Sequence, residues 1–281
     1  MLAPVKEILQ IAEASNTAVI GFNCIDYNQI YAIATAAQRA KKPVLCMLYP
    51  EHAQLNNMTS PELFAETVKY IAAKVNVPIG LHMDHCQDFN YIVRALKAGF
   101  SSVMYDGSML SLEDNTANTK KVAQVAHAMG AIVEAELGHV GTADTANDQN
   151  NKDLYTQPDI AAKFIEESGC DTLAVAIGSA HGFYKETPHL DINRLSEIND
   201  ATPAPLVLHG GSGIPDDQLD LAFTHGINKF NVGTEFFKLY FDLHQSYYSD
   251  KRYAEGIFDF AEYSQNRLME YLVQKLSLSK F

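Results

Sequence analysis

The sequence predicts a (β/α)8 barrel, also called a TIM barrel, and three observations lead to that prediction. Eight short segments rich in Val, Ile, Leu and Ala recur along the 281 residues. Amphipathic segments with helical spacing lie between them, and such an alternation is typical of a parallel sheet covered by helices. With 47% apolar residues the chain can bury one large core, so we expect a single barrel domain over residues 1–281.

The predicted strands combine β-branched or aliphatic residues with a polar or glycine residue near the end. They cover residues 17–23, 43–48, 77–84, 101–106, 131–138, 172–177, 205–210 and 227–233. Helical spacing is clearest in residues 4–14, 27–42, 60–75 and 114–130. A doubly wound open sheet is the alternative, but it usually has fewer strands and a glycine-rich first turn, which is absent here.

Two segments depart from the regular alternation. Residues 138–156, after the fifth strand, are polar, rich in Asn and Asp and nearly devoid of aliphatic residues. We interpret this long loop as a mobile lid over an active site, with an ordinary surface loop as the alternative. Residues 253–278 form an amphipathic C-terminal helical extension, which either caps the barrel or makes a subunit contact; the pattern favours neither.

The composition argues against several classes of partner. The formal net charge is −13, from 34 acidic and 21 basic residues, which speaks against nucleic acid or an anionic membrane. A phosphorylated small molecule stays compatible, because backbone amides can bind a phosphate locally. No apolar run has the length of a membrane span, and no signal sequence is recognisable. The four cysteines lack paired spacing, so we expect a reduced, cytoplasmic protein.

Three histidines lie at or after the ends of predicted strands: His85 after the third, His181 after the sixth and His209 in the seventh. Because the carboxyl ends of barrel strands meet at one face, we expect these side chains to converge. Three imidazoles with an open fourth position are the ligand set of a catalytic zinc ion. Cys86 would close that position as a fourth ligand, and we favour a packing role for it.

Four carboxylates accompany the histidines near the predicted strand ends. They are Asp84, Asp106, Glu134 and Glu136. Asp84 precedes His85, so both side chains reach one pocket only if the strand ends there. Glu134 and Glu136 point to the same side of the fifth strand. Any one of them alone is best explained as a structural carboxylate, but the four together favour a polar catalytic centre.

Two glycine-containing turns have the features of an anion site. HGGSG, with Gly210, Gly211 and Ser212, follows the seventh strand, and NVGTE, with Gly233 and Thr234, follows the eighth. Each turn offers backbone N–H groups and a hydroxyl at the start of a helix, where the helix dipole favours negative charge. In barrels the loops after strands seven and eight are a recurrent phosphate site.

Together these segments resemble the class II, zinc-dependent ketose-bisphosphate aldolases, a family that includes fructose- and tagatose-bisphosphate aldolases. The resemblance spans essentially the whole chain. Its motifs are GFN at Asn23, LHMDHC at 81–86, VMYDGS at Asp106, VEAELG at Glu134, AVAIGSAHGFYK at 174–185, LVLHGGSGIP at 206–215 and NVGTE at 231–235.

The resemblance implies reversible cleavage of a ketose 1-phosphate or 1,6-bisphosphate to dihydroxyacetone phosphate and an aldehyde, through an enediolate stabilised by zinc. It implies that Asp84 exchanges the proton of the hydroxyl at the cleaved bond and that Asp144 is the proton shuttle of the lid. The implied metal ligands are His85, His181 and His209, with Asp106 and Glu134 at an alternative or second divalent position. The implied substrate-binding residues are Asn23, Gly182, Lys185, Gly210, Gly211, Ser212, Asn231 and Thr234. The family also implies a monovalent cation (Na+ or K+) near the phosphate and a homodimer or homotetramer.

The chain departs from the family pattern in three places. Relatives carry a small, Ser-containing turn after the second strand, whereas residues 49–52 here read YPEH. Asp144 stands at the acid position of the lid with one methylene less reach, and Gly233 stands where relatives have a side chain. Bulky and acidic groups in the turn would repel a second phosphate. We therefore predict an altered aldehyde half that takes an unphosphorylated or longer sugar, with neutral drift as the alternative.

Three function classes are compatible with a barrel of this kind. A zinc aldolase is favoured, because every metal and proton-transfer position is filled, although three histidines suit several divalent ions. A non-catalytic barrel subunit or partner of an aldolase complex would be signalled by loss of a histidine or of Asp84, and neither is lost. A zinc hydrolase on a barrel often has an HxH pair on its first strand, where this chain has GFNC.

Overall fold

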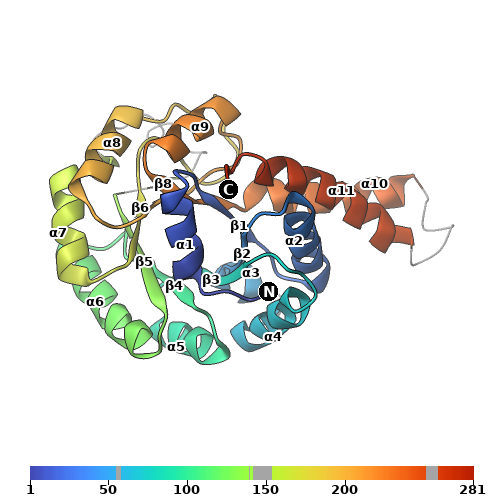
Figure 1. Ribbon diagram of the computed structural model, residues 1–281, viewed down its shortest axis with the longest axis horizontal. Helices are drawn as coiled ribbons and strands as arrows, with labels where there is room; N and C mark the ends of the chain where they lie inside the picture. The colour runs from blue at the N-terminus through green and yellow to red at the C-terminus, as the bar shows by residue number, and fades with distance from the viewer. Residues whose placement is uncertain (55–57, 139, 142–153, 251–258) are drawn as a thin grey trace.

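The protein is a closed parallel barrel of eight strands surrounded by helices, as the sequence predicts (Figure 1). The structure is a computed structural model that describes residues 1–54, 58–138, 140–141, 154–250 and 259–281. Each strand pairs in parallel with the next, and β8 closes the barrel on β1. The strands are β1 Val19–Asn23, β2 Val44–Leu48, β3 Ile79–Cys86, β4 Ser102–Tyr105, β5 Ile132–Leu137, β6 Thr172–Val175, β7 Leu206–Leu208 and β8 Ile227–Val232.

Helices follow the strands in the described parts of the chain, and many begin where the sequence provides an N-cap. Asp26, Ser60, Asp88, Ser111 and Asp191 each accept a hydrogen bond from a backbone N–H of the helix that follows. None of the described helices is long and apolar enough to cross a membrane. The helices are α1 Val5–Ala14, α2 Tyr27–Ala40, α3 Pro50–Gln54, α4 Pro61–Ala72, α5 Phe89–Ala98, α6 Leu112–Ala128, α7 Pro158–Ser168, α8 Ile192–Ala201, α9 Asp216–Thr224, α10 Thr234–Ser249 and α11 Asp259–Leu276.

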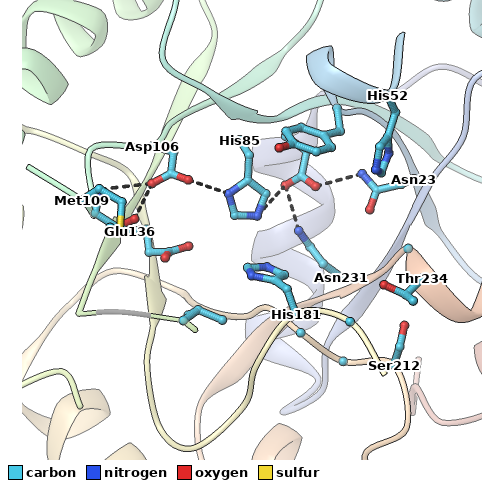
Figure 2. Close-up of a pocket in the computed structure, with 18 residues that line it drawn as sticks. Asn23, His52, His85, Asp106, Met109, Glu136, His181, Ser212, Asn231 and Thr234 are labelled. Atoms are coloured by element: carbon cyan, nitrogen blue, oxygen red, sulfur yellow. Dashed lines mark hydrogen bonds and ion pairs between the residues drawn. The ribbon is translucent and has the colours of Figure 1, made fainter. Parts of the chain in front are cut away.

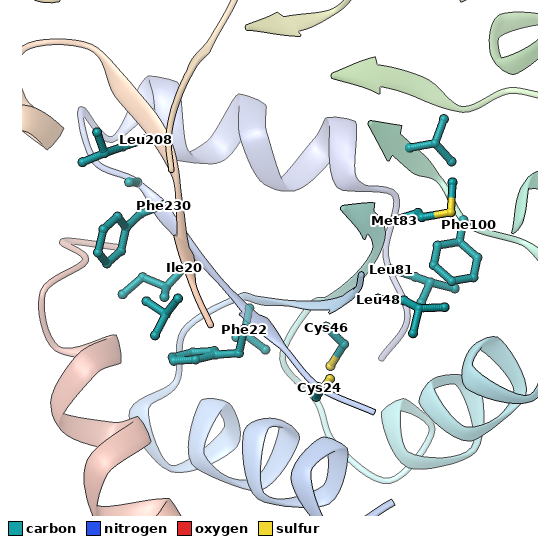
Figure 3. Close-up of a cluster of buried hydrophobic side chains, with 14 of the residues drawn as sticks. Ile20, Phe22, Cys24, Cys46, Leu48, Leu81, Met83, Phe100, Leu208 and Phe230 are labelled. Carbon is teal, nitrogen blue, oxygen red and sulfur yellow. The ribbon is translucent and has the colours of Figure 1, made fainter. Parts of the chain in front are cut away.

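The core has two layers because successive strand residues point to opposite faces. Outward-facing residues such as Ile20, Phe22 and Leu208 pack under the helices in one large cluster (Figure 3). Inward-facing residues near the amino ends of the strands pack against α1, which closes that end of the lumen. This second cluster comprises Val5, Ile8, Leu9, Val19, Leu45, Met47 and Ile132. A pocket into the lumen therefore has to open at the carboxyl ends of the strands.

The lumen becomes polar toward those carboxyl ends. His82 in β3, Glu134 in β5 and Lys229 in β8 are all buried inside the barrel. Residues two positions farther along the same strands point to the same side and reach the open end. The barrel thus carries one polar layer within its core and a second at its mouth.

The C-terminal helices settle one question that the sequence left open. α11 packs against α2 on the outside of the barrel, and Figure 1 shows α10 and α11 projecting together to one side. The chain end returns to β1, where the Ser279 hydroxyl donates to the carbonyl oxygen of Ala18 at 2.7 Å. The extension is therefore part of the outer helical layer rather than a cap over the lumen.

Candidate metal centre and phosphate site

A cavity of about 350 Å³ opens at the carboxyl ends of the strands and contains most of the predicted site (Figure 2). The rings of His85 and His181 line this cavity and pack against the ring of His209, which is fully buried and is not among the lining residues; the three centroids are 4.6 to 5.9 Å apart. One nitrogen of each lies within 4.8 Å of the others, a spacing that could hold a metal ion. The described residues lining the cavity are Asn23, Tyr49, His52, Asp84, His85, Asp106, Ser108, Met109, Glu136, Val140, His181, Gly182, Gly210, Gly211, Ser212, Asn231, Gly233 and Thr234.

An irregularity in β3 brings two consecutive residues into the cavity. We predicted that the strand ends at Asp84, but β3 continues to Cys86, and its register on β4 shifts between Met83 and Cys86. His85 has a φ of +37°, a left-handed conformation that few non-glycine residues adopt. This local strain turns His85 to the same side as Asp84, which a regular strand could not do.

Asp106 holds His85 in place. The Nδ1 of His85 lies 2.9 Å from Oδ2 of Asp106, whose other oxygen accepts a hydrogen bond from the hydroxyl of Ser108 at 2.7 Å. With Nδ1 bonded to a carboxylate, the Nε2 of His85 is left for a ligand. Burial lowers the pKa of His85, but the charge of Asp84 and the bond to Asp106 outweigh burial and raise it.

Two glutamates hold His209. Its Nδ1 lies 3.0 Å from Oε2 of Glu136, and its Nε2 lies 3.0 Å from Oε1 of Glu134. Burial alone lowers the pKa of His209, but the hydrogen bonds to the two glutamates raise it to about 10. Because Glu136 lines the cavity and Glu134 does not, Nδ1 is the nitrogen on the cavity side.

His181 comes from the loop after β6 rather than from a strand. Its backbone N–H donates to the carbonyl oxygen of Gly141 at 2.8 Å, which ties this loop to the segment after β5. Burial and the neighbouring charge of His85 lower the pKa of His181 to about 4. The ring is therefore neutral near pH 7, as a metal ligand has to be.

Asp84 is fixed by two amides at the centre of the cavity. The side-chain NH2 groups of Asn23 and Asn231 donate to its two oxygens at 2.8 and 3.0 Å. Burial raises the pKa of Asp84, but the positive charges of His85 and Lys229 hold it well below its usual range. Asp84 is therefore an ionised carboxylate with both oxygens oriented.

Both predicted phosphate-binding turns line the cavity. Gly210 has a φ of +66°, and a side chain there would lie 2.4 Å from the carbonyl oxygen of Ala180. Ser212 accepts a hydrogen bond from the backbone N–H of Glu235 in the first turn of α10, at 3.2 Å. The Tyr184 hydroxyl donates to the carbonyl oxygen of Gly210 at 2.8 Å, so the two loops are held together. Backbone amides and the α10 N-terminus can bind an anion here.

The structure separates some predicted site residues from the cavity. Glu134 lies in the inner polar layer, in a group with His82 and Asp84 that could also hold a metal ion, whereas Glu136 is the glutamate beside His85 and Asp106. Side chains alternate between the two faces of a strand, so the sequence places Glu134 and Glu136 on the same face of β5. From the sequence alone, Glu136 was as good a candidate for the second metal position as Glu134. Lys185 is exposed and is not among the described lining residues, so its phosphate contact stays a prediction. Asp144 lies outside the described residues.

Two side chains of the turn after β2 lie at the cavity, where the sequence analysis expected this turn to alter the aldehyde half of the site. Tyr49 and His52 both line the cavity, and their rings meet edge to face with centroids 4.5 Å apart. Glu51 is exposed and does not line the cavity, but its carboxylate accepts a hydrogen bond from the hydroxyl of Tyr49. The bulk of this turn, rather than its acidity, reaches the cavity.

Comparisons with known proteins agree with this geometry. The family model "Fructose-bisphosphate aldolase class-II" matches residues 3–278. Protein YdjI of Escherichia coli (strain K12), which is described as uncharacterized, is 37% identical over 235 residues, covering 84% of each chain. The crystal structure of the YdjI aldolase from Escherichia coli K12 superposes with a TM-score of 0.87 at 32% identity, covering 99% of this chain and 97% of that one. A fructose-bisphosphate aldolase from Campylobacter jejuni shares the fold, with a TM-score of 0.83, 22% identity, and 99% and 95% of the two chains covered.

Proposed function

The chain belongs to the class II fructose-bisphosphate aldolase family, and we propose that it is a metal-dependent aldolase acting on a ketose 1-phosphate. The proposed reaction is reversible cleavage to dihydroxyacetone phosphate and an aldehyde. The observation that carries the proposal is the convergence of three histidines and an oriented, ionised carboxylate on one cavity beside an anion site.

The donor set fits a divalent metal ion, for which we propose zinc. His85 has one nitrogen bonded to a carboxylate and the other available, the usual arrangement of a metal-binding histidine. Both nitrogens of His209 contact glutamates, so a metal ion would replace the proton that Nδ1 shares with Glu136 while Nε2 stays bonded to Glu134. His85, His181 and His209 would hold the ion, with Asp106 and Glu136 beside His85 as a second position. A bound divalent ion supplies Lewis-acid stabilisation of the negative charge that develops at the ketone oxygen.

The protein's own side chains supply proton transfer and orientation. Asp84 would accept the proton of the hydroxyl at the cleaved bond, since its oxygens are ionised and fixed by Asn23 and Asn231. The turns around Gly210 and Thr234 would hold the phosphate and so position the ketone end of the substrate. A Schiff-base mechanism is disfavoured, because no lysine is among the described residues that line the cavity.

The far end of the cavity favours an aldehyde without a phosphate. Among the described residues that line the cavity there is neither lysine nor arginine, whereas Asp84, Asp106 and Glu136 are acidic. Tyr49 and His52 fill the side after β2, and His52 also packs against Phe237 at a centroid distance of 5.0 Å. A second phosphate there would be desolvated without a cation to pair with it. An unphosphorylated sugar aldehyde suits this wall.

Steady-state kinetics of the metal-loaded enzyme test this specificity. We expect kcat/KM for fructose 1-phosphate to exceed that for fructose 1,6-bisphosphate by at least about tenfold. Tyr49→Ser should reduce this preference by opening the wall, whereas Tyr49→Phe, which keeps the ring, should preserve it. Equal or better cleavage of the bisphosphate by the unmodified enzyme would contradict the proposed substrate class.

Cellular context follows from the same proposal. The four cysteines are buried and unpaired, which suits the reducing cytoplasm that we propose as the location. A homodimer or homotetramer, and a monovalent cation beside the phosphate, stay predictions from the family. A non-catalytic role is disfavoured, because the described structure brings the three histidines together and places Asp84 at the same cavity.

A further inference from the structure

A buried lysine lies one layer below the histidine cluster and takes no part in the chemistry proposed above. Lys229 in β8 is fully buried, and its Nζ lies 3.0 and 2.9 Å from the two oxygens of Glu134 in β5. It is not among the described residues that line the cavity, so it does not contact a substrate there. Burying an ion pair is expensive, and such a pair adds little stability compared with apolar packing. Its presence in the lumen therefore calls for a function.

The partner of Lys229 is also the partner of a predicted metal ligand. The same oxygen of Glu134 that contacts Lys229 at 3.0 Å lies 3.0 Å from Nε2 of His209. The other nitrogen of His209, Nδ1, faces the cavity, where Glu136 lies 3.0 Å away. To offer the Nδ1 lone pair to a metal ion, His209 has to release the proton that Nδ1 shares with Glu136 and keep the one on Nε2, where Glu134 accepts it and fixes the ring orientation.

Glu134 has few other groups to hold it in that position. Besides Lys229 and His209, its nearest charged or titratable neighbour among the described residues is His82, whose Nε2 is 3.9 Å from Oε2. His82 is itself turned toward Ser102, with its Nδ1 2.8 Å from the Ser102 hydroxyl. The ammonium group of Lys229 is therefore the contact that engages both carboxylate oxygens and sets their direction.

We propose that Lys229 is a positioning residue for the metal centre: it anchors Glu134, which in turn holds His209 with Nδ1 facing His85 and His181. This inference rests on the proposed function, because it assumes that the three histidines bind a divalent ion. Lys229 acts through Glu134 and is neither a metal ligand nor a nucleophile. Outer carboxylate partners of metal-binding histidines typically change metal affinity by about 10- to 100-fold, and we expect the lysine to share that effect.

Metal affinity measured by competition with a chromogenic chelator tests the inference without any need for substrate. The variants are Lys229→Met, Glu134→Gln and the double variant, each also unfolded thermally in its metal-free form. Each single variant should bind Co2+ or Zn2+ about tenfold or more weakly than the unmodified protein. The double variant should be no weaker than the weaker single one, because Lys229 acts only through Glu134.

Stability separates positioning from a merely structural role. Each single variant leaves one buried charge without its partner, whereas the double variant buries no charge at this position. The double variant should therefore unfold at a higher temperature than either single variant, while its metal affinity stays weakened. Lys275→Met, which breaks a partly buried ion pair with Glu235 between α10 and α11, is the matched control and should leave metal affinity unchanged. If Lys229→Met does not fold, the double variant still tests the inference, because unchanged metal affinity in it would overturn the proposal.

Metal affinity within about twofold of the unmodified protein in a folded Lys229→Met or double variant would overturn the inference. Affinity that recovers together with stability in the double variant would also overturn it. Failure of the proposed function looks different, because the unmodified protein would then bind no stoichiometric divalent metal or would bind it without aldolase activity.

Discussion

Carboxylates hold two of the three clustered histidines through different ring nitrogens. Asp106 bonds Nδ1 of His85, so Nε2 of this ring is left for a ligand, whereas Glu134 bonds Nε2 of His209 and Glu136 lies at its Nδ1 on the cavity side. In the proposed metal centre the two rings would therefore bind through different nitrogens. Contacts with residues that are distant in sequence therefore determine which nitrogen of a histidine is free for a ligand.

Sequence analysis identified the histidines and Asp84 because their residue types and strand-end positions are local features. It could not distinguish Glu134 from Glu136, since both point into the barrel and only depth in the lumen separates them. It also missed Tyr184, whose hydroxyl joins the loops after β6 and β7, because a tyrosine in a loop has no distinctive pattern.

Replacing Asp84 by asparagine should separate proton transfer from metal binding. The amide side chain has nearly the same shape as the carboxylate but cannot accept the hydroxyl proton, so kcat for cleavage should fall by about 10²- to 10⁴-fold. The three histidines are unchanged, so one equivalent of metal should still be bound, as elemental analysis would report. Retention of kcat within about tenfold would show that another group takes the proton.

His82 should make the folded protein less stable in acid. Burial, and then the charge of Lys229, lower its pKa to about 3, whereas an unfolded chain has a histidine pKa of about 6.5. Between these values only the unfolded state binds the proton, so stability falls as pH decreases. Relative to His82→Gln, the metal-free protein should lose about 2 kcal/mol between pH 8 and pH 5 in urea unfolding. Parallel pH profiles for the two proteins would contradict this assignment.

At the scale of elements, two irregular segments bring groups to the cavity that a regular strand would direct elsewhere. β3 is bent at His85, and the turn after β7 brings Gly210 against the backbone of Ala180. The sequence predicted all eight strands because the alternation of apolar and helical segments is strong. It predicted the end of β3 wrongly, because the shift in register depends on the pairing with β4.

Gly210 should tolerate no side chain, and Gly169 provides a matched comparison. Both have left-handed backbones, with φ of +66° and +72°, but a Cβ at Gly169 meets nothing within 4 Å. Alanine at either position should cost about 1–2 kcal/mol for the conformation. Alanine at Gly210 should cost about 1–3 kcal/mol more, since it displaces the Ala180 carbonyl. Urea unfolding of both variants measures the difference, and equal losses would contradict the close approach seen here.

At the scale of the molecule, the barrel gathers residues of β1, β3, β5 and β8 at one mouth, together with residues of the segments that follow β2, β4, β5, β6, β7 and β8. The convergence of the three histidines could be predicted because a closed parallel barrel allows only one common face for strand ends. The role of Asp144 stays a prediction, since it lies outside the described residues. The single-domain organisation and the homo-oligomer stay predictions as well, because neither leaves a local signature in the sequence.

Metal binding should stabilise the whole barrel by mass action. An ion that binds only the folded protein adds about 2.7 kcal/mol at a free concentration about one hundred times its Kd. Thermal unfolding with buffered Zn2+ should therefore shift upward, and a chelator should reverse the shift. His181→Ala should lose this gain, whereas His189→Ala, at an exposed histidine outside the cavity lining, should keep it. An equal shift in both variants would mean that the metal binds elsewhere.

Exchange of solvent deuterium into dihydroxyacetone phosphate tests the central claim most directly, because this half-reaction needs no knowledge of the aldehyde. We expect exchange that depends on the metal-loaded enzyme, disappears with a chelator, and returns when Zn2+ is restored. Absence of exchange in a folded protein with one equivalent of metal bound would contradict the assignment of this barrel as a metal-dependent aldolase.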